Sequence, residues 1–166
     1  IKLENGILFD SENVACFIDS LSDGKVTIPD GITAIPRMMF ARSNITEITI
    51  PNTVKTVGDG AFYNCQTIEE VVFPDSVERI GSQVFNGCKN LKKVKLSKNL
   101  DKDLEALREM SDCWFYNCIN LETVVIPEGL PLIPYYTFYG CTSLKNVNIP
   151  NSVKTISVGA FSNCTS

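Results

Sequence analysis

The chain has 166 residues, with 15 Lys and Arg residues against 19 Asp and Glu residues, a formal net charge of −4, seven cysteines and no histidine. This length indicates one soluble globular domain, and an acidic balance without runs of Lys or Arg argues against nucleic acid as a partner. No apolar run is long enough to cross a bilayer, so membrane insertion is not expected. The missing histidine excludes Ser-His-Asp and Cys-His catalysis, His-ligated metal sites and an imidazole pH switch.

A segment of 22 or 23 residues recurs through the chain and is marked by three residue types in one register. An apolar residue followed by proline marks most copies, a phenylalanine marks every copy, and a cysteine usually comes three residues after the phenylalanine. The interval from Phe85 to Phe115 alone is longer, so that copy carries an insertion of seven residues. The markers are Pro29, Pro51, Pro74, Pro127 and Pro150; Phe40, Phe62, Phe85, Phe115, Phe138 and Phe161; and Cys65, Cys88, Cys118, Cys141 and Cys164, with Ser43 in the first copy.

Each copy also carries a strand pattern ahead of its proline position. In residues 91–96, Val94 and Leu96 alternate with lysines, which is the period-two pattern of a strand with one buried face. Where a proline follows, it has no N–H to donate and fixes its φ angle, so the strand ends and a turn begins. Because one copy cannot bury its apolar groups alone, we expect the copies to stack as the rungs of a solenoid.

The repeated cysteines have two alternative interpretations: buried free thiols, or a disulfide chain or metal site. Five of the seven occupy one repeat position, so neighbours are expected one strand spacing apart, about 4.8 Å. Parallel side chains at that spacing hold their Cβ atoms farther apart than the ~3.8 Å of a disulfide, which favours buried thiols. Spacing by whole repeats also excludes CxxC-type zinc and redox motifs. Cys16 and Cys113 lie off this position, and we expect Cys113 to be the more reactive thiol.

The insertion lies at residues 101–110 and favours a short helix. An Asp near its start can cap that helix, and Leu104, Leu107 and Met110 recur every three residues along one face. One interpretation is a surface bulge packed on the convex side of the solenoid, and the other is a protruding recognition element. Its acidic residues lack the glycine and the spacing of an EF-hand calcium loop.

Aromatic residues provide the sharpest binding prediction. If the repeat Phe points inward, the next residue points outward, which places Tyr116 and Tyr139 one above the other. Exposed Tyr and Trp supply contact area at low entropic cost and stack on sugar rings or partner side chains. The alternative is ordinary packing, in which Trp114 replaces the repeat's alanine and covers the insertion. The predicted ligand patch consists of Tyr63, Trp114, Tyr116, Tyr135, Tyr136 and Tyr139.

The full pattern, apolar-x-x-Val-x-Ile-Pro-x-x-Val-x-x-Ile-Gly-x-x-Ala-Phe-x-x-Cys, resembles the BspA-like leucine-rich repeat. Residues 50–66 and 149–164 match it almost position for position, and the resemblance covers about residues 26–166. It implies a β-rich, right-handed leucine-rich-repeat solenoid with parallel stacked strands and about six repeats. Residues 1–25 resemble the irregular β-hairpin often found between runs of such repeats, within one continuous domain. The resemblance also implies a non-enzymatic binding scaffold on bacterial or protist surfaces, but names no ligand.

Since leucine-rich-repeat proteins usually bind on their concave sheet, the outward strand positions are a second candidate surface. These positions pass from acidic to basic to neutral along the chain, without an aromatic or single-sign stripe. A neighbouring column, Glu69, Lys92, Glu122 and Lys145, alternates in sign and indicates charge pairing between rungs. The predicted concave-face contacts are Glu47, Glu70, Lys93, Lys95, Asn146 and Asn148.

Both chain ends look like parts of incomplete rungs. Residues 1–3 resemble the tail of a strand, and the last copy stops at residues 164–166, before its strand. We therefore expect a piece of a longer array, and end-to-end self-association through uncapped terminal rungs.

These observations predict non-catalytic recognition of a protein or glycan by a cell-surface or secreted protein, with no cofactor and no metal. The alternative is a structural spacer that displays other domains of a longer surface protein. An enzyme is disfavoured because the sequence has no histidine and no nucleophile-base or phosphate-cradling motif.

Overall fold

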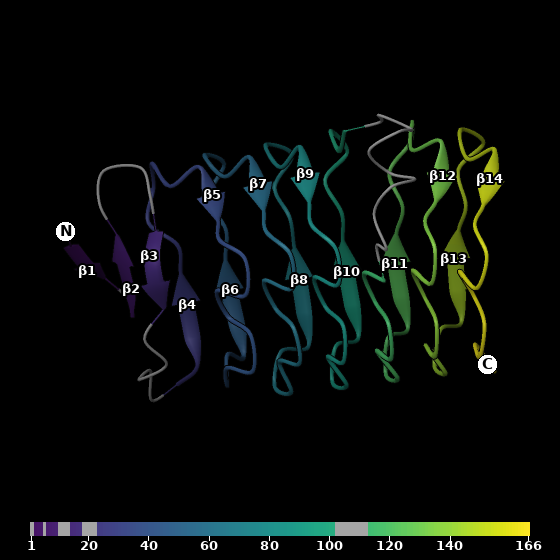
Figure 1. Cartoon of the computed structure of the whole chain (residues 1–166), viewed down its shortest axis with the longest axis horizontal. Helices are drawn as coiled ribbons and strands as arrows, with labels where there is room; N and C mark the ends of the chain where they lie inside the picture. The colour runs from purple at the N-terminus through teal and green to yellow at the C-terminus, as the bar shows by residue number, and fades with distance from the viewer. Residues whose placement is uncertain (1, 5, 10–13, 18–22, 102–112) are drawn as a thin grey trace.

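The structure is a computed structural model that describes residues 2–4, 6–9, 14–17, 23–101 and 113–166. These residues form a β-solenoid in which one turn of chain stacks on the next, with short strands in two separate rows (Figure 1). This confirms the leucine-rich-repeat solenoid expected from the repeat. The predicted helix at residues 101–110 lies almost wholly outside the described residues. In the described residues no helix occurs, so none there is long and apolar enough to cross a bilayer.

The first wall consists of three-residue strands in which the middle side chain points to the core and its neighbours point to solvent. The strands pair in parallel and in register, so that Val94 lies between Val71 and Val124. Hydrogen bonding divides the wall into two ladders, β4–β6 and β8–β10–β11–β13. The strands are β4 (Lys25–Thr27), β6 (Glu47–Thr49), β8 (Glu70–Val72), β10 (Lys93–Lys95), β11 (Thr123–Val125) and β13 (Asn146–Asn148).

The second wall consists of two-residue strands that come after the proline turn. It also contains two ladders, β5–β7–β9 and β12–β14. The rung that carries the insertion lies between these two ladders, and its residues 102–112 are outside the described residues. The strands are β5 (Ala34–Ile35), β7 (Thr56–Val57), β9 (Arg79–Ile80), β12 (Leu132–Ile133) and β14 (Thr155–Ile156).

The third side of each rung is a turn built around the repeat Phe. The residue two positions before each Phe and the residue two positions after it adopt positive φ angles, and these bend the chain. Every second N–H group of the turn donates to a backbone carbonyl of the next rung. For example, Phe62 N donates to Val84 O at 2.9 Å and Phe115 N to Thr137 O at 2.9 Å. The positive-φ residues are Met38, Arg42, Gly60, Asn64, Gln83, Gly87, Cys113, Asn117, Tyr136, Gly140, Gly159 and Asn163.

The core runs along the solenoid axis as two columns. The phenylalanine rings stack face to face, with adjacent centroids 5.1 to 5.6 Å apart. Beside them, each repeat cysteine donates its thiol to the carbonyl of the Phe in the preceding rung, as in the 2.9 Å contact from Cys88 Sγ to Phe62 O. All seven cysteines are free thiols, and four of the five repeat cysteines are buried, as expected from the spacing.

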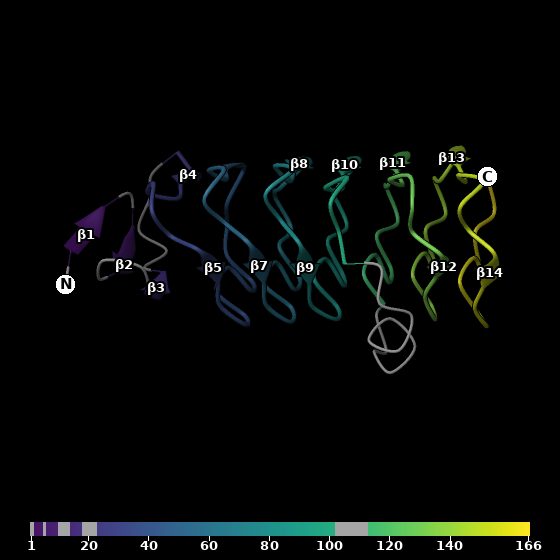
Figure 2. The same ribbon diagram turned by 90° about the horizontal axis from the view of Figure 1, so that it is seen from above.

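The two ends of the solenoid differ. At the N-terminal end, β1 (Lys2–Glu4), β2 (Ile7–Phe9) and β3 (Val14–Phe17) form an antiparallel sheet, seen beside the first rung in Figure 2. The Phe17 ring packs edge-on against Phe40, with centroids 4.9 Å apart, so the sheet covers the start of the phenylalanine column. At the other end, Ile156 is 52% exposed and Val158 is 71% exposed. The last rung therefore leaves apolar side chains in solvent.

Candidate functional site

Three tyrosines from two adjacent rungs form a partly exposed aromatic cluster beside the phenylalanine column. The rings of Tyr116 and Tyr139 are parallel within 7°, with centroids 4.6 Å apart, as the repeat position predicts. Tyr136 meets Tyr139 edge-on, with centroids 5.9 Å apart. We call Tyr116, Tyr136 and Tyr139 the tyrosine patch. Stacked, amphipathic rings of this kind offer a flat surface with hydroxyl groups at its edge.

Local backbone geometry explains how the patch is held. Tyr136 has a φ of 54° and its ring lies over Gly159, where an added Cβ would come within 2.4 Å of Tyr136 Cε1. A side chain at residue 159 would therefore displace the ring. Partial loss of hydration, and after it the neighbouring Tyr139, raise the pKa of Tyr116 above its ordinary value. Tyr116 therefore stays a neutral hydroxyl group to a higher pH than an ordinary tyrosine.

The structure separates the other predicted aromatic residues from this patch. Trp114 is only 3% exposed, so its expected place on an exposed surface is wrong. The reason is that the residue before the repeat Phe points inward, as Ala61 and Val84 do in other rungs. Tyr63 is half-buried two rungs away, and Tyr135 is 40% exposed; neither makes a ring contact with a described aromatic residue.

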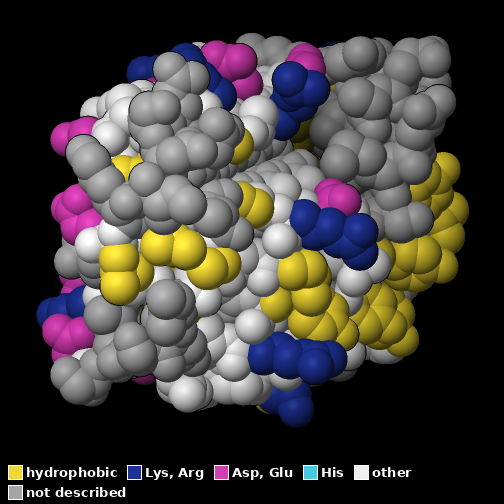
Figure 3. All heavy atoms as spheres, turned by 60° about the vertical axis from the view of Figure 1, so that its left-hand side comes forward, with side chains coloured by type: hydrophobic (Ala, Val, Ile, Leu, Met, Phe, Trp, Pro, Cys, Tyr) yellow, Lys and Arg dark blue, Asp and Glu magenta, His cyan; other side chains and the backbone are white. Residues whose placement is uncertain are grey.

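Two ion pairs join adjacent strands on the outward face of the first wall. Glu47 binds Lys25 at 2.9 Å and Glu70 binds Lys93 at 2.9 Å, while Lys95 makes no ion pair with a described residue. Asn146 and Asn148 are exposed at the last strand. Figure 3 likewise shows Lys and Arg side chains close to Asp and Glu side chains along one edge of the molecule.

The residues of the column with alternating charge, Glu69, Lys92, Glu122 and Lys145, form ion pairs between rungs, as their alternation predicts. Lys92 Nζ lies 2.8 Å from Glu69 Oε2, and Lys145 Nζ lies 3.9 Å from Glu122 Oε2, each pair joining adjacent rungs. All four side chains are more than half exposed, so these pairs fix the rung register and add little stability.

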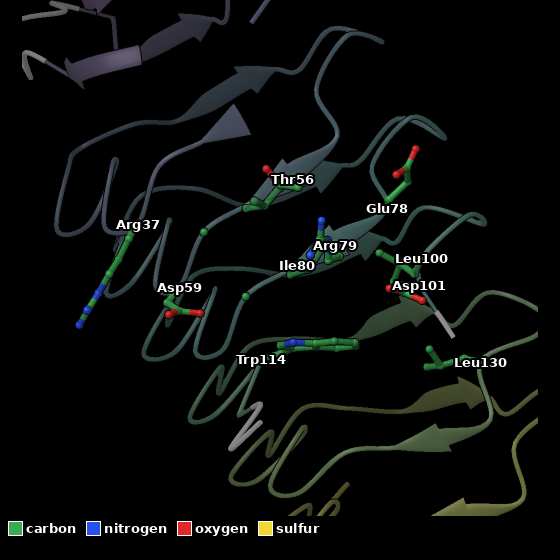
Figure 4. Close-up of a pocket in the computed structure, with 13 residues that line it drawn as sticks. Arg37, Thr56, Asp59, Glu78, Arg79, Ile80, Leu100, Asp101, Trp114 and Leu130 are labelled. Carbon is green, nitrogen blue, oxygen red and sulfur yellow. The ribbon is translucent and has the colours of Figure 1, made fainter. Parts of the chain in front are cut away.

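A pocket of about 430 Å³, which we call the wall pocket, lies beside the strands of the second wall. Figure 4 shows Trp114 below Ile80, with Leu100 and Leu130 on the opposite side from Arg37 and Asp59. Sequence reasoning missed this site. The available signal was the coincidence of the insertion with a tryptophan in place of the small repeat residue, since both change the same rung. The lining residues are Arg37, Thr56, Val57, Gly58, Asp59, Glu78, Arg79, Ile80, Gly81, Leu100, Asp101, Trp114 and Leu130.

A buried donor lies at this pocket without an acceptor. Trp114 Nε1 is inaccessible and has no hydrogen-bond partner in the described residues. Leaving such a group unsatisfied costs about 1–3 kcal/mol, and native structures contain few examples.

The described residues contain no group of three His, Cys, Asp or Glu side chains placed to hold a metal ion. Two of the repeat thiols are also poorly suited to ligation, because burial raises the pKa of Cys88 and Cys118 well above the ordinary value and a metal requires the thiolate.

Comparison with known proteins connects these features to one family. The sequence profile described as the BspA type leucine rich repeat region matches six copies, over residues 13–105 and 108–166. None of the curated protein sequences that were compared matches the chain.

Three solved bacterial structures have a similar fold. A leucine-rich repeat protein from Eubacterium ventriosum is 26% identical, with a TM-score of 0.74 over 99% of this chain and 50% of its own. The leucine-rich repeat protein of T. pallidum is 21% identical, with a TM-score of 0.69 over 92% of this chain and 80% of its own. A leucine-rich cell surface protein from Faecalibacterium prausnitzii is 21% identical, with a TM-score of 0.50 over 85% of this chain and 57% of its own.

The chain thus spans half the length of the Eubacterium ventriosum protein. Six matched repeats, with their register visible in the two walls, the phenylalanine column and the cysteine column, place the chain in the BspA-type leucine-rich repeat family.

Proposed function

We propose that this chain is a non-catalytic recognition module of a cell-surface or secreted protein and that it binds a protein or glycan partner through the tyrosine patch. The observation that carries the proposal is the stacking of Tyr116 on Tyr139 at a partly exposed position, with Tyr136 against the edge. Aromatic rings with a polar edge are enriched at binding surfaces because they bury large areas at low entropic cost.

Two further observations support a surface role. The Faecalibacterium prausnitzii structure of similar fold is described as a leucine-rich cell surface protein. In addition, the positions that recur in every rung are occupied by core and turn residues. The position after the repeat Phe is not one of them, so it is free to vary from rung to rung. That position reads Ala41, Tyr63, Asn86, Tyr116, Tyr139 and Ser162 along the chain.

The test measures binding of the full chain to a glycan array and to an array of purified surface proteins. We expect the double variant Tyr116→Ala/Tyr139→Ala to lose at least about tenfold in affinity, since residues at the centre of an interface carry most of its binding energy. Tyr63→Ala is the matched control, because Tyr63 has the same repeat position two rungs away.

Equal binding by the wild type and the double variant, at an unchanged melting temperature, would contradict the tyrosine patch as the site. Absence of any ligand on both arrays would instead favour the spacer, a scaffold that displays other domains of a longer surface protein.

A further inference from the structure

The stacked pair Tyr116 and Tyr139 is unlike any other pair of tyrosines in the chain. All five tyrosines lie in the described residues, and only in this pair do two tyrosine rings stack in parallel, within 7° and with centroids 4.6 Å apart. Tyr136 meets Tyr139 edge-on, at an interplanar angle of 69°. Tyr63 and Tyr135 make no ring contact with a described aromatic residue. Chemistry that needs two parallel phenols is therefore possible at one place only.

The backbone holds this pair at a fixed spacing. Each of its tyrosines directly follows a repeat Phe, and the rings of Phe115 and Phe138 stack within 6° at 5.4 Å. Backbone hydrogen bonds join the two turns on both sides of the pair, from Phe115 N to Thr137 O at 2.9 Å and from Asn117 N to Tyr139 O at 2.8 Å. The two phenol rings are thus kept next to each other by the rungs themselves, without a ligand or a partner.

The hydroxyl ends of the two rings also lie together. Partial loss of hydration, and after it the nearby Tyr139, raise the pKa of Tyr116. An effect of Tyr139 on this hydroxyl group requires the two phenolic oxygens to be close. Parallel rings whose hydroxyl groups are neighbours bring the Cε atoms of one ring beside the Cε atoms of the other. In a phenoxyl radical, the unpaired electron resides largely on the oxygen and on ring carbons that include these two.

We propose that Tyr116 and Tyr139 form a site of oxidative cross-linking, at which a peroxidase and hydrogen peroxide join the two side chains as dityrosine. Each phenol gives up one electron and one proton, and the two phenoxyl radicals pair their electrons in a new Cε–Cε bond. Each bonded carbon then releases its hydrogen as a proton while the ring oxygen takes one up, which restores two phenols. Hydrogen peroxide accepts the two electrons and two protons and becomes two molecules of water, so the chain loses two hydrogen atoms.

The step requires little movement of the two side chains. The ring centres of two phenols joined by a single C–C bond lie slightly closer than the 4.6 Å found here. The rings approach that arrangement by turning about their Cβ–Cγ bonds, and this torsion is broad in tyrosine. Groups held in contact react as if each were present at very high concentration, so coupling within one chain is expected to exceed coupling between chains.

The new bond joins adjacent rungs covalently. It closes a loop between residues 116 and 139, and a covalent link of this kind restricts the unfolded chain in the way that a disulfide does. Since all seven cysteines are free thiols, no disulfide serves this purpose in the structure. The inference goes beyond the proposed function and does not depend on it, because the cross-link forms whether or not the tyrosine patch binds a partner.

The test treats the full chain, at about 1 μM to disfavour coupling between chains, with a haem peroxidase and hydrogen peroxide. A thiol reductant is added afterwards, because it reverses disulfides, which cause the same change in mass, but leaves dityrosine intact. We expect a monomer that is lighter by two hydrogen atoms and shows dityrosine fluorescence. Cleavage after Glu122 and Glu128 should then leave the peptides that carry Tyr116 and Tyr139 joined to each other.

Phenylalanine variants identify the two coupled rings, since they keep the ring and remove only the phenolic hydroxyl. Tyr116→Phe and Tyr139→Phe are each expected to lower the yield of cross-linked monomer at least about tenfold. Tyr63→Phe and Tyr135→Phe are the matched controls and should leave the yield unchanged. Tyr63 has the same repeat position as the stacked pair, and Tyr135 lies in the same rung as Tyr139 and is 40% exposed.

Three results would overturn the inference: cross-linked monomer that is as abundant in Tyr116→Phe as in the wild type, a yield that Tyr136→Phe lowers as much as Tyr116→Phe does, or a product that consists mainly of dimers. Absence of dityrosine in both the wild type and Cys113→Ser would also overturn it. The second protein is included because Cys113 is a partly exposed thiol near Tyr116 that can reduce its radical. None of these results concerns binding by the untreated chain, so a failure of the cross-link and a failure of the proposed function are distinguishable.

Discussion

A buried backbone carbonyl has two lone pairs, and in this solenoid the carbonyl of the repeat Phe uses both. Phe85 O accepts from Cys88 N of its own turn at 3.0 Å and from Cys118 Sγ of the next rung at 3.0 Å. In the first rung there is no repeat Phe from a preceding rung, and Ser43 Oγ donates to Phe40 O of its own turn at 2.7 Å. A small donor is therefore what the position requires, and cysteine supplies it with little polar surface to bury.

Because these thiols are buried, the stability of the folded chain is expected to fall at alkaline pH. Burial raises the pKa of Cys118 well above its ordinary value, so the thiol stays protonated when folded but ionises above about pH 8.5 when unfolded. The unfolded state then binds fewer protons, and the free energy of unfolding falls as pH rises. We expect Cys118→Ser, which retains a donor that does not titrate, to reduce this loss by about 1.4 kcal/mol per pH unit above about pH 9.5.

The measurement is denaturant unfolding of both proteins from neutral pH to about pH 10.5, where thiol ionisation of the unfolded chain is nearly complete. Parallel curves for the wild type and Cys118→Ser would show that this thiol does not couple folding to protons. A substitution of the exposed Cys16 by Ser is the control and should leave the slope unchanged.

At the scale of the strand, the two faces of the first wall make unequal contributions. The middle residues of the strands interlock in register behind the wall, and Val94 is fully buried between Val71 and Val124. The outward residues form ion pairs with side chains that are half exposed, such as Lys92 with Glu69. Burial of the valine side chains removes apolar area from water and so stabilises the fold. An exposed ion pair gains little, because both charges are also well hydrated when they are apart.

We therefore expect Val94→Ala to lower the free energy of unfolding by about 2–3 kcal/mol and Lys92→Ala to lower it by less than about 1 kcal/mol. Urea unfolding at low and high salt checks both values, and only the Lys92→Ala effect should shrink with salt. A larger loss for Lys92→Ala than for Val94→Ala would mean that the charged column, and not the buried one, holds the rungs together.

Prediction from sequence succeeded where the repeat imposes a fixed position. The stacking of Tyr116 on Tyr139, the burial of four of the repeat thiols and the pairing of Lys92 with Glu69 all follow from register alone. It failed for Trp114, because the direction of a side chain beside a positive-φ residue depends on the turn and not on alternation. The wall pocket was also beyond reach, since its lining combines residues from five successive rungs, from Arg37 to Leu130.

Over the whole molecule, stability is expected to be a sum of rung interfaces, each shared only by neighbours. The antiparallel sheet covers one end of the phenylalanine column through Phe17, while Ile156 and Val158 remain exposed at the other. An apolar end face of this kind favours contact with another apolar surface. End-to-end association of this chain is therefore a prediction.

We expect the isolated chain to associate as its concentration rises, and the double variant Ile156→Lys/Val158→Lys to remain monomeric, because like charges would face each other across the contact. Sedimentation velocity over a range of concentrations measures this. The matched control is Val72→Lys, which changes an apolar residue, 47% exposed, on the side of the solenoid. A wild-type chain that is monomeric throughout, or a control that dissociates as fully as the double variant, would contradict the end contact.

The positive-φ residues on both sides of each repeat Phe have a consequence for how such a surface can change over time. They fix the path of the turn by backbone conformation, so the residue directly after the Phe can be alanine, asparagine, serine or tyrosine without altering the rungs. Diversification at this one column, whether by natural selection or in a combinatorial library, can therefore produce new specificities on an unchanged scaffold. Because the rungs stack about 5 Å apart, such changes compose a binding surface in regular steps along the axis.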